Sequence, residues 1–507
     1  MTTLRQYQHD IVGEFEATVA SGTRRVIVVA ATGAGKTIVA GEIMRRAVAA
    51  GQRVLFLSHR VEITKQTSAK LLDVDISHGI LQAGFATELD APVQVASVQT
   101  LHGRGIRRST IELPPADLLI VDECHHATAA TYKKIIEAYP GAALLGLTAT
   151  PCRGDGRGLG GIFETLIECP QVPELIEGKF LVGTRVYAPS QPDLKGVKVQ
   201  AGDYVESQLA ERMDVPQLVG DIPTHWHRHA EGRRTVVFAT GVQHSVHIRD
   251  EFRKSGVACD HLDGSTPKDE REAILQKLAC GAIDVVSNCA ILTEGFDCPD
   301  IGCIVLARPT RKMGLFRQMI GRGLRPAESK VDCIIIDHAG AVHRHGFAED
   351  RVEWTLDPDK PAKNPTHTKR TEGDIRSRLV DCKQCGALRT GGEACRHCGF
   401  LPSPRPRHVG TVDADLALLQ RNGRTVGHYL GPADRERWHR QLAYIAVERG
   451  YKSGWAAHKF KEKFGQWPSA RFVQPMTPTP EVRSWVRSRQ IAFAKARQKA
   501  AAADAAA

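Results

Sequence analysis

A short glycine-rich turn near the N-terminus has the residue types that bind phosphate. The β-branched run at residues 26–29 predicts a buried strand, and an apolar-periodic helix follows the turn and ends before Gly51. Between them stand Thr32, Gly33, Ala34, Gly35, Lys36 and Thr37. Glycines let backbone N–H groups face an anion, and a helix start adds partial positive charge. Lys36 could therefore reach the β- and γ-phosphates of a nucleotide, and the Thr37 hydroxyl could bind Mg²⁺. Ala30 replaces the first glycine of the usual pattern.

An acidic pair, Asp122 and Glu123, follows a second apolar run at residues 118–121. Adjacent carboxylates at a strand end can divide the work of hydrolysis. Asp122 would support the metal ion, and Glu123 would accept a proton from the attacking water. Because phosphoryl transfer needs positioning and charge neutralisation more than covalent help, this pair and Lys36 together predict hydrolysis of a bound nucleotide.

Two arginines in the second half of the chain, Arg322 and Arg325, stand three residues apart on a helical stretch and so share one face. This half has no phosphate-binding turn of its own. An arginine presented from a second lobe can stabilise the charge on a γ-phosphate during its transfer. We expect these side chains to complete a site that begins in the first half.

Four of the thirteen cysteines form two C-x-x-C pairs with nine residues between them: Cys382, Cys385, Cys395 and Cys398. Four thiolates suit tetrahedral Zn²⁺ and leave no open coordination position, so the pattern predicts a structural zinc ribbon. The alternative is a redox or disulfide pair, which a reducing cytosol disfavours. The sequence leaves open whether the ribbon grips DNA or is purely architectural.

Alternating strands and helices must position these residues. Beyond residues 26–29, strands are predicted at 54–57, 93–98, 118–121, 144–147, 235–238, 283–287, 304–306 and 333–336. Such alternation predicts parallel sheets, which bind ligands at the carboxyl ends of their strands. Most of the polar motifs directly follow an apolar strand. The fold class is therefore α/β.

Length and composition favour a multidomain globular protein. The chain has 507 residues, of which 42% are hydrophobic and 25% are charged. We find no apolar run that could span a bilayer and no signal peptide at residues 1–10, so we expect a cytoplasmic protein.

The basic excess lies in the last third of the chain. Residues 361–507 carry 27 Lys and Arg against 12 Asp and Glu, a net charge of +15, whereas residues 1–360 carry −4. Four of the six tryptophans are also there, which suits a polyanion with bases to stack on; an Arg-rich solvated helical module is the alternative. Helices are predicted at residues 414–420, 432–448 and 455–464. Trp455, Phe460 and Phe464 share one face, as core or as a stacking platform.

Taken in order, the motifs resemble those of superfamily 2 helicases and translocases, of DEAD/DEAH type in the broad sense, over roughly residues 1–350. These motifs are ATGAGKT, SHR, VASVQT, DECH, TATP, TEGFD and QMIGRGLR. Together with the cysteine ribbon, TATPCRGDGRGLG and LTEGFDCPD look most similar to RadD-like bacterial and phage helicases. The resemblance implies two tandem RecA-like domains with ATP and Mg²⁺ between them. DECH stands where relatives have DEAD or DEAH, which leaves DNA or RNA open.

The resemblance also implies roles for individual residues. Those expected to bind the nucleotide are Arg5, Gln8, Thr32, Gly33, Ala34, Gly35, Lys36, Thr37, Asp122 and Asp297, with Gln8 on the adenine edge. Those expected to be catalytic are Lys36, Glu123, Arg322 and Arg325. Positions that match nucleic-acid contacts are Arg60, Gln99, Thr100 and Thr293. Thr148 and Thr150 match the motif that couples the ATP site to the strand site.

We divide the chain into a RecA-like domain at 1–168, a connector at 169–215, a second RecA-like domain at 216–350, a linker at 351–378, a zinc ribbon at 379–402 and a basic helical accessory region at 403–507. The glycine-rich residues 153–161 could grip a phosphate backbone or form a mobile loop. The expected activity is that of an ATP-dependent DNA helicase or translocase. The resemblance implies a role in DNA repair or recombination, with protein partners from those processes. Alternatives are an RNA-directed remodeller, the motor of a restriction or defence complex, and a strand-binding ATPase switch without unwinding.

Overall fold

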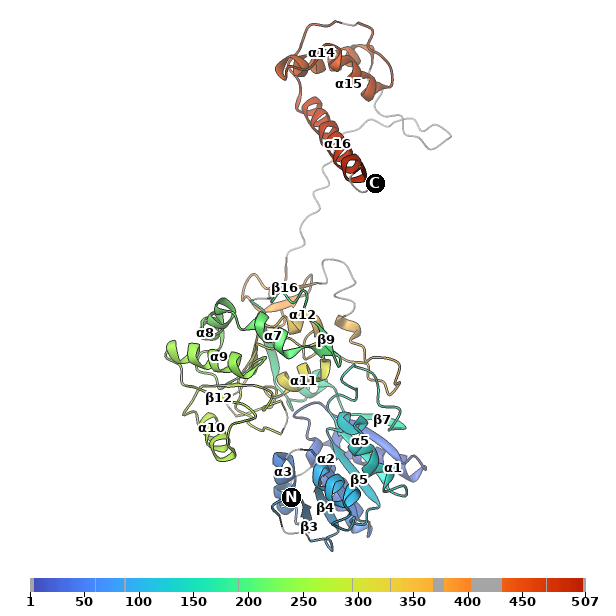
Figure 1. The fold of residues 1–507 in the computed structure, drawn as a ribbon, viewed down its shortest axis with the longest axis vertical. Coiled ribbons are helices and arrows are strands. Elements are labelled where there is room, and N and C mark those ends of the chain that lie inside the picture. The colour runs from blue at the N-terminus through green and yellow to red at the C-terminus, as the bar shows by residue number, and fades with distance from the viewer. Residues whose placement is uncertain are drawn as a thin grey trace. The chain divides into compact units, whose positions relative to one another are not determined.

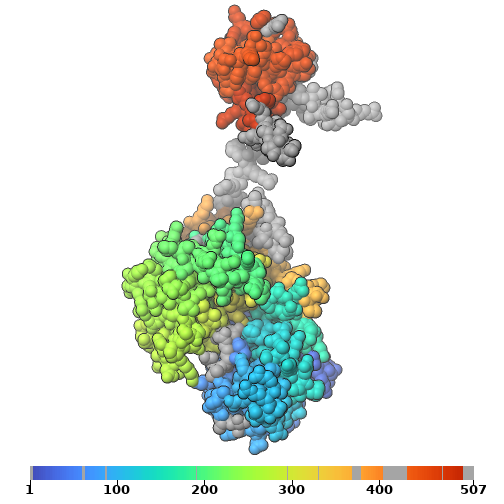
Figure 2. All heavy atoms as spheres, in the orientation of Figure 1, coloured from blue at the N-terminus to red at the C-terminus, as the bar shows by residue number. Residues whose placement is uncertain are grey.

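The computed structural model describes residues 4–59, 61–85, 88–189, 191–293, 295–328, 330–367, 378–402, 431–470 and 472–504. It separates into two compact units, Met1–Pro404 and Arg405–Ala507 (Figure 1). The first unit contains two parallel sheets, whose residues form adjoining masses, blue to cyan and green to yellow, in the space-filling view (Figure 2). Among the described residues, no helix has the length and apolar character that a membrane span requires.

The first sheet has seven strands in the order β3-β4-β2-β5-β6-β1-β7, all paired in parallel. They are β1 (Arg25–Val29), β2 (Val54–Ser58), β3 (His78–Leu81), β4 (Val93–Ser97), β5 (Leu118–Asp122), β6 (Ala143–Thr148) and β7 (Thr165–Glu168). The central strands are Val-, Ile- and Leu-rich and almost wholly buried, because helices cover both faces of such a sheet. The prediction of a parallel sheet is confirmed.

Strand order brings the polar motifs of the first sheet together. Because β5, β6 and β1 are neighbours, residues 32–37, Asp122, Glu123 and residues 148–150 all lie at one edge. The helical segments of this half are α1 (Gln6–Ala20), α2 (Lys36–Ala49), α3 (Val61–Asp73), α4 (Val98–Thr100), η1 (Leu101–Arg107), η2 (Cys124–Thr128) and α5 (Ala130–Glu137). Helix α2 buries Val39, Ile43 and Ala47, a stripe at helical spacing that fixes its start against β1.

The second sheet has six parallel strands in the order β12-β13-β11-β14-β15-β8. They are β8 (Gly183–Tyr187), β11 (Thr235–Phe238), β12 (Cys259–Leu262), β13 (Val285–Asn288), β14 (Cys303–Leu306) and β15 (Asp332–Asp337). The helices of this half are α6 (Val172–Glu177), α7 (Glu206–Met213), α8 (Pro216–Ala230), α9 (Val242–Lys254), α10 (Lys268–Cys280), α11 (Met313–Gly321) and α12 (Ala341–His345). This architecture matches the expected second RecA-like domain.

The connector at residues 169–215, whose pattern indicated some strand content, contains strand β8. It pairs with β15 along its whole length and forms an edge of the second sheet. Polar residues hid this strand in the sequence, because Thr184 and Arg185 interrupt its apolar pattern. In the structure they have partners from elsewhere: Thr184 Oγ1 donates to Glu349 over 2.6 Å, and the Arg185 guanidinium pairs with Asp332.

A further segment, residues 352–364, fastens the two halves of the first unit together, and we call it the strap. It was expected to begin a linker but packs against the glycine-rich residues 153–161. The Gly158 N–H donates to the Asp357 carbonyl over 3.0 Å, and Gly160 N–H donates to that of Leu356 over 2.6 Å. A Cβ at Gly158 would lie 2.4 Å from the Leu356 carbonyl carbon, so the strap can approach only glycine there.

A short β-hairpin follows β8 in the sequence. Its strands are β9 (Val199–Gln200) and β10 (Asp203–Tyr204), paired antiparallel. Asp203 is buried and accepts hydrogen bonds from Thr310 Oγ1 over 2.8 Å and from the Arg311 N–H over 2.7 Å. These bonds anchor the hairpin to the segment that precedes α11.

The cysteine-rich segment forms a second hairpin, with β16 (Leu379–Asp381) and β17 (Leu388–Thr390) antiparallel. It packs on the edge strand of the second sheet: Ala387 joins the apolar cluster that contains Tyr187, and the Arg396 guanidinium lies 5.5 Å from the Phe347 ring. An exposed edge strand can pair with other chains, so this cover protects β8.

The C-terminal unit has a helical core of its own, built from α14 (Pro432–Glu448), α15 (Trp455–Phe464) and α16 (Pro480–Asp504). Buried in it are Trp438, Leu442, Ile445, Phe460, Val482 and Val486. Trp455 and Phe464 pack against this cluster, so the aromatic face of α15 belongs to the core rather than to a stacking platform. The helix expected at residues 414–420 lies outside the described residues.

Candidate active site

The turn after β1 presents backbone N–H groups at the start of α2. Gly33 and Gly35 both have a φ of 89°, in the left-handed region that favours glycine. Gly35 is the N-cap of α2 and offers no side chain, which leaves the N–H groups of the first helical turn for an anion. The geometry suits a phosphate group.

A buried ion pair crosses the site. Lys36 Nζ lies 3.1 Å from Glu123 Oε1, and the side chains are 13% and 8% exposed. Glu123 has a φ of 48°, where a residue other than glycine is strained. Strain of this kind is found at functional sites, and here it lies at the residue whose carboxylate pairs with Lys36.

Asp122 lies at the end of β5 beside this pair, and its Oδ1 accepts the Glu123 N–H over 3.0 Å. Burial, and then the negative charge of Glu123, raise the pKa of Asp122 to about 6. Ionising a buried carboxyl beside another carboxylate is unfavourable unless a cation is bound. Together with the Thr37 hydroxyl, this donor set fits a hard divalent cation such as Mg²⁺.

The two arginines of the second half meet the same site. The buried Arg322 donates from Nε and Nη2 to the Thr293 carbonyl, and from Nη1 to the Phe296 carbonyl over 2.7 Å. Arg325 Nη1 lies 2.9 Å from Asp297 Oδ1. Backbone carbonyls therefore hold Arg322, whereas Arg325 Nη1 is shared between Asp297 and, over 3.2 Å, the Phe296 carbonyl, so a stronger anion could replace the carboxylate.

Both halves line one cavity of about 230 Å³. The residues on its walls are Thr32, Gly33, Gly35, Lys36, Thr37, Ile38, Ile63, Gln66, Thr67, Lys70, Asp122, Glu123, Gly295, Phe296, Asp297, Arg322 and Arg325. The halves approach closely here, since a Cβ at Gly321 of α11 would lie 2.5 Å from Thr32 Cβ. The cavity thus brings together nearly all the residues expected to bind phosphate.

Arg5 and Gln8 lie beside the phosphate-binding turn. Neither is among the residues that line the nucleotide cavity. Gln8 Nε2 donates to the Ala34 carbonyl over 3.3 Å, and Tyr7 Oη donates to the same carbonyl over 2.7 Å. The Arg5 guanidinium lies 4.4 Å from the Phe180 ring. The structure therefore shows these residues supporting the turn, and their contact with adenine stays a prediction.

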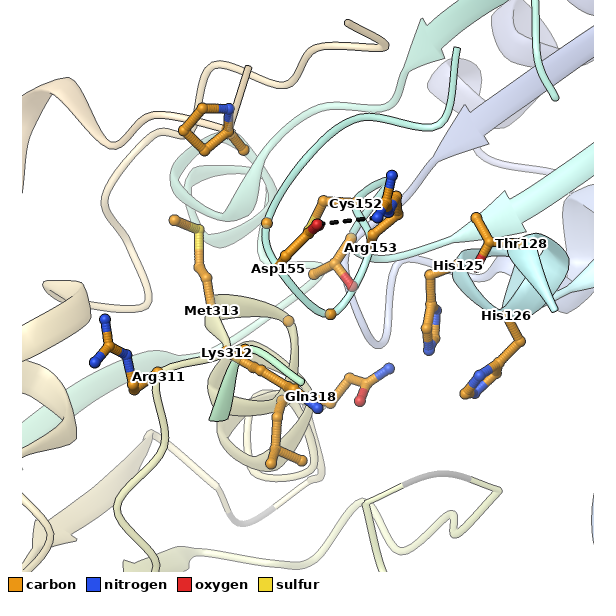
Figure 3. A pocket seen from close by; sticks show the side chains of 18 of the residues that line it. His125, His126, Thr128, Cys152, Arg153, Asp155, Arg311, Lys312, Met313 and Gln318 are labelled. Carbon is orange, nitrogen blue, oxygen red and sulfur yellow. Dashed lines mark ion pairs between the residues drawn. The ribbon is translucent and has the colours of Figure 1, made fainter. Parts of the chain in front are cut away.

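A side chain that sequence reasoning missed, His125, connects the acidic pair to the predicted coupling threonines. Its Nδ1 lies 3.4 Å from Glu123 Oε2 and 3.2 Å from Thr148 Oγ1. Thr148 Oγ1 in turn accepts the Thr150 N–H over 3.1 Å. His125 and Thr150 also line a larger neighbouring cavity (Figure 3). His125 ends the DECH motif, two residues after Glu123, but the sequence could not give its partners because they depend on the backbone turn at Glu123.

Comparisons with known proteins agree with this geometry. Residues 1–153 match the family of the type III restriction enzyme res subunit, and residues 215–327 match the helicase conserved C-terminal domain. A 51.5 kDa protein of a Lactococcus phage is 30% identical over 391 residues, which cover 77% of this chain and 81% of the phage protein. The chain belongs to the superfamily 2 helicases. The matched domains are those of an ATP-driven nucleic-acid motor.

Other relatives of this helicase support the same family. The Saccharomyces cerevisiae protein IRC3, named as an ATP-dependent helicase, is 32% identical over 67% of this chain and 52% of its own length. This helicase thus spans about half the length of IRC3. A solved fragment described as the HsdR subunit of a type I restriction enzyme from Vibrio vulnificus has a TM-score of 0.54 at 23% identity. The match covers 68% of this chain and 67% of the fragment, and it shows that the two share a fold. The narrower likeness to RadD-like helicases stays a prediction.

The residues expected to contact nucleic acid are spread over both halves of the helicase. Gln99 Nε2 donates to the His59 carbonyl over 3.0 Å, and Thr100 ends α4 beside it. Thr293 is buried in the second half, with its carbonyl bonded to Arg322. Arg60 lies outside the described residues. Their contact with a strand stays a prediction.

Helix α3 contributes cavity residues that the sequence did not single out: Gln66, Thr67 and Lys70. Gln66 Nε2 donates to the Gly295 carbonyl over 2.7 Å, which bridges the two halves of the helicase. A polar side chain on an amphipathic helix gives no sequence signal of such a bridge, because it depends on how the second half docks.

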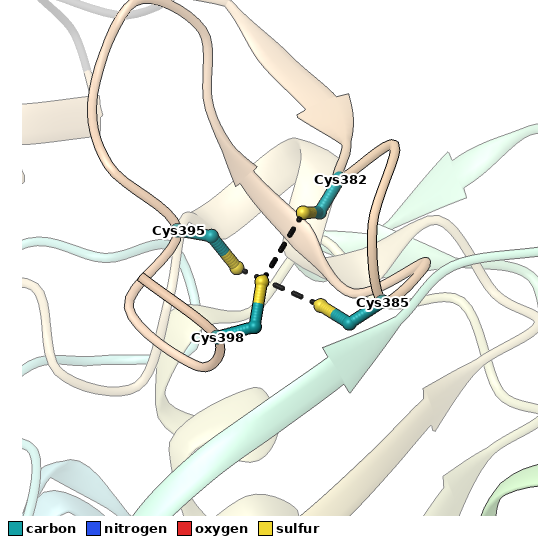
Figure 4. A group of neighbouring side chains, drawn as sticks. All are labelled: Cys382, Cys385, Cys395 and Cys398. Carbon is teal, nitrogen blue, oxygen red and sulfur yellow. Dashed lines mark hydrogen bonds between the residues drawn. The ribbon is translucent and has the colours of Figure 1, made fainter. Parts of the chain in front are cut away.

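The four clustered cysteines converge as the zinc prediction requires (Figure 4). Their sulfur atoms all lie within 4.8 Å of one another, with Cys382 and Cys398 at 3.6 Å and Cys385 and Cys395 at 3.7 Å. Both pairs of thiols are farther apart than the ~2.05 Å of a disulfide. The set fits a four-coordinate metal with no open position.

Proposed function

We propose that this helicase is an ATP-dependent DNA motor, a helicase or translocase, that hydrolyses ATP between its two sheets. The observation that supports this most directly is the shared cavity. Lys36 and Glu123 stand on one wall, and Arg322 and Arg325 stand on the other. A nucleotide bound there would touch both halves at once, so its hydrolysis could change how they are held together.

ATP binding would change the partner of Lys36. Its ammonium lies 3.1 Å from Glu123. A triphosphate in the glycine turn carries more negative charge than one carboxylate, so Lys36 would move to the β- and γ-phosphates and release Glu123. Glu123 would then take a proton from water as its oxygen attacks the γ-phosphorus. The bond to the β–γ bridging oxygen breaks, which gives ADP and phosphate.

The remaining polar groups would neutralise charge. Thr37 and Asp122 would hold Mg²⁺, which lowers the phosphate charge that Lys36 must balance. Arg325 would exchange Asp297 for a γ-phosphate oxygen, while the carbonyls of Thr293 and Phe296 keep Arg322 in place beside it. After hydrolysis the γ-phosphate no longer bridges the halves, they separate, and repeated cycles would move the protein along a strand.

DNA is the proposed substrate because the matching res-subunit family and the similar HsdR fragment belong to restriction enzymes, which act on DNA. Both the res-subunit family match and the HsdR-like fold favour one second candidate, the motor of a restriction or defence complex. RNA as the substrate and an ATPase switch without unwinding are outcomes of the test below. A role in DNA repair or recombination, with partners there, rests on the resemblance to RadD-like helicases.

We also propose that the four cysteines hold structural Zn²⁺ and that the C-terminal unit is an accessory module. The cysteine hairpin covers β8, which favours the architectural alternative over a DNA grip. Zinc binding needs free thiolates, and a reducing cytoplasm is the compartment that supplies them.

ATP hydrolysis should be measured with single strands, duplexes and forks of DNA and RNA. We expect single-stranded or branched DNA to stimulate turnover most. Lys36→Ala and Glu123→Gln should lower stimulated turnover by about 10²-fold or more, because each removes a group that contacts phosphate or water. Lys133→Ala, an exposed change on α5, is the matched control.

Preferential stimulation by RNA would instead select the RNA-directed remodeller. Stimulation by DNA without strand separation or translocation would select the switch. Near-normal turnover of both Lys36→Ala and Glu123→Gln would contradict the proposed motor altogether.

A further inference from the structure

The C-terminal unit carries a positive charge that its own carboxylates do not neutralise. Residues 431–507 contain 15 Lys and Arg against 6 Asp and Glu, a net charge of +9. Three of the six carboxylates are already engaged with a nearby cation. These pairs are Asp434 with Arg437, Glu448 with Arg483, and Glu462 with Lys459. A small unit with this excess of positive charge attracts a polyanion.

Trp467 is an aromatic side chain of this unit that lies outside its core. It follows α15 and is 52% exposed, whereas Trp438 of the core is 5% exposed. The Lys461 ammonium lies 4.5 Å from the centre of the Trp467 ring, and the His458 ring lies 5.0 Å away at 76°. Both neighbours come from α15 and hold the ring while more than half of the residue stays open to solvent. A nucleic-acid base can stack on such a ring.

A second ring, that of Trp485 on α16, has two cations beside it. The Lys463 ammonium lies 5.7 Å from its centre, and the Arg489 guanidinium lies 5.9 Å from it. Lys463 also lies 4.8 Å from the centre of the Trp438 ring. The electron-rich rings hold these cations near each other, although their like charges repel. An anion bound between them would relieve that repulsion.

Lys461, Lys463 and Arg489 are exposed, and we call them the cation set. Within residues 431–470 and 472–504, none of the three forms an ion pair or a side-chain hydrogen bond. Lys461 and Lys463 both belong to the last turn of α15, so the surroundings of Trp467 and Trp485 adjoin. The contacts with the rings restrict these long side chains before a ligand arrives, which lowers the entropy cost of binding.

We propose that the C-terminal unit is a separate binding site for single-stranded DNA, with a base stacked on Trp467 and phosphates bound by the cation set. This inference rests on the proposed function and gives the accessory module a task. Unpaired bases are required, because a base inside a duplex offers no free face to Trp467. A strand is favoured over an anionic lipid surface because the first unit is a nucleic-acid motor, which engages a strand itself.

The consequence is that two linked units bind one strand. Linkage raises the affinity of the whole chain without any new contact, because binding of the second unit becomes intramolecular. The C-terminal unit would therefore keep the helicase on its strand while the nucleotide cavity of the first unit opens and closes.

The test measures binding of a fluorescein-labelled oligothymidylate to the full chain by anisotropy, without ATP and over a range of salt concentrations. Trp467→Ala should raise the Kd about tenfold and leave the slope of log K against log salt unchanged, because it removes stacking and no charge. Lys461→Gln/Lys463→Gln should raise the Kd by a similar factor. It should also lower the magnitude of the slope by about 1.4, or about 0.7 for each phosphate that is no longer neutralised.

Lys452→Gln is the matched control, because Lys452 is an exposed lysine of the same unit in the loop before α15. Lys461→Arg/Lys463→Arg keeps both charges and should bind like the wild type. ATPase activity without DNA should be the same in all variants. A photo-crosslinking residue at the exposed Gln466 gives a second readout, and a cross-link to the strand supports the site.

The inference is overturned if Trp467→Ala and Lys461→Gln/Lys463→Gln both bind the oligonucleotide as Lys452→Gln does, with no cross-link from position 466. Variants that lose binding to phosphatidylglycerol vesicles but keep strand binding would also overturn it, in favour of a lipid surface. The proposed function survives either result as long as DNA stimulates ATP hydrolysis. Wild-type protein whose ATPase ignores DNA would instead contradict the proposed function itself.

Discussion

At the scale of single residues, the central feature of the site is the buried carboxylate of Glu123, which requires a cationic partner. Glu123 is 8% exposed in its side chain, and Lys36 neutralises it at 3.1 Å. A buried carboxylate left without its cation costs several kcal/mol. The nucleotide-free protein thus keeps its general base masked by the lysine that ATP requires, so base release and phosphate binding become one event.

Asp122 makes the pH dependence of stability testable. Its pKa of about 6 lies above the ordinary value, so the folded state holds a proton that the unfolded state releases between about pH 4 and pH 6. Stability from this group is therefore lost as pH rises. Asp122→Asn should raise the free energy of unfolding at pH 7.5 by up to about 3 kcal/mol, and the gain should vanish near pH 4.

Denaturant titrations of the nucleotide-free protein at both pH values check this. Asp10→Asn, an exposed change on α1, should leave the free energy of unfolding within about 0.5 kcal/mol of wild type. Equal effects of Asp122→Asn at pH 4 and pH 7.5 would show that the carboxyl is not held protonated.

Residue types and spacing were enough to predict which groups surround the nucleotide. Lys36 begins α2 and Asp122 ends β5, and both line the cavity as expected. Arg322 and Arg325 line it too, although they were expected on a helix and instead follow the end of α11 at Gly321. His125 could not be assigned a partner, since its contact with Thr148 depends on the left-handed turn at Glu123. Sequence patterns do not report such backbone turns at residues other than glycine.

At the scale of elements, helix α11 joins the halves through one face. Gly314, Gln318 and Gly321 recur at helical spacing and lie toward the first half. A Cβ at Gly314 would lie 3.0 Å from Thr150 Oγ1, and one at Gly321 would lie 2.5 Å from Thr32 Cβ. Glycine is needed at Gly321 because of this close approach, not because of its backbone angles.

Gly321→Ala should therefore hold α11 away from the phosphate-binding turn. We expect stimulated ATP turnover to fall by about tenfold or more, since a misplacement of about 1 Å can cost about 10²-fold. Gly220→Ala on α8 is the control, because its Cβ would meet no atom within 4 Å. Normal turnover by Gly321→Ala would mean that the close approach to Thr32 is not part of the working state.

The cysteine hairpin should stabilise the second sheet more than the first. We expect one zinc per chain by metal analysis. Removing the metal, or Cys385→Ser, should lower hydrogen-exchange protection of β8 by about tenfold or more and leave β1 unchanged, because the hairpin packs on β8. Equal loss in both sheets, or no zinc, would contradict this role.

The sequence pattern did not locate β8 within the connector or the contacts of the strap, and both have the same cause. Strand β8 has polar residues that find partners on Glu349 and Asp332, and the strap has prolines without apolar periodicity. Each is ordered by segments far away in the chain. Local pattern predicts elements that bury their own apolar face, and it misses those fixed by distant polar partners.

At the scale of the molecule, the first unit is two parallel sheets, and several contacts between described residues connect them. Among them are the shared nucleotide cavity, the Gln66–Gly295 hydrogen bond, the close approach of α11 to Thr32, and the strap on the glycine-rich loop. No described residue of the strap lines the nucleotide cavity, so we expect the strap to stay attached when the cavity opens. The C-terminal unit has its own core and is a separate body.

The central claim is that one nucleotide is held by the first half and completed by an arginine of the second. Arg325→Ala tests it most directly, by DNA-stimulated turnover together with ADP affinity, with the exposed Arg228→Ala on α8 as control. The account predicts a loss of turnover of about 10²-fold or more, because an arginine that stabilises the transferred phosphoryl group is worth ~10³–10⁵, with ADP affinity within about threefold of wild type. Turnover of Arg325→Ala equal to that of Arg228→Ala would contradict it.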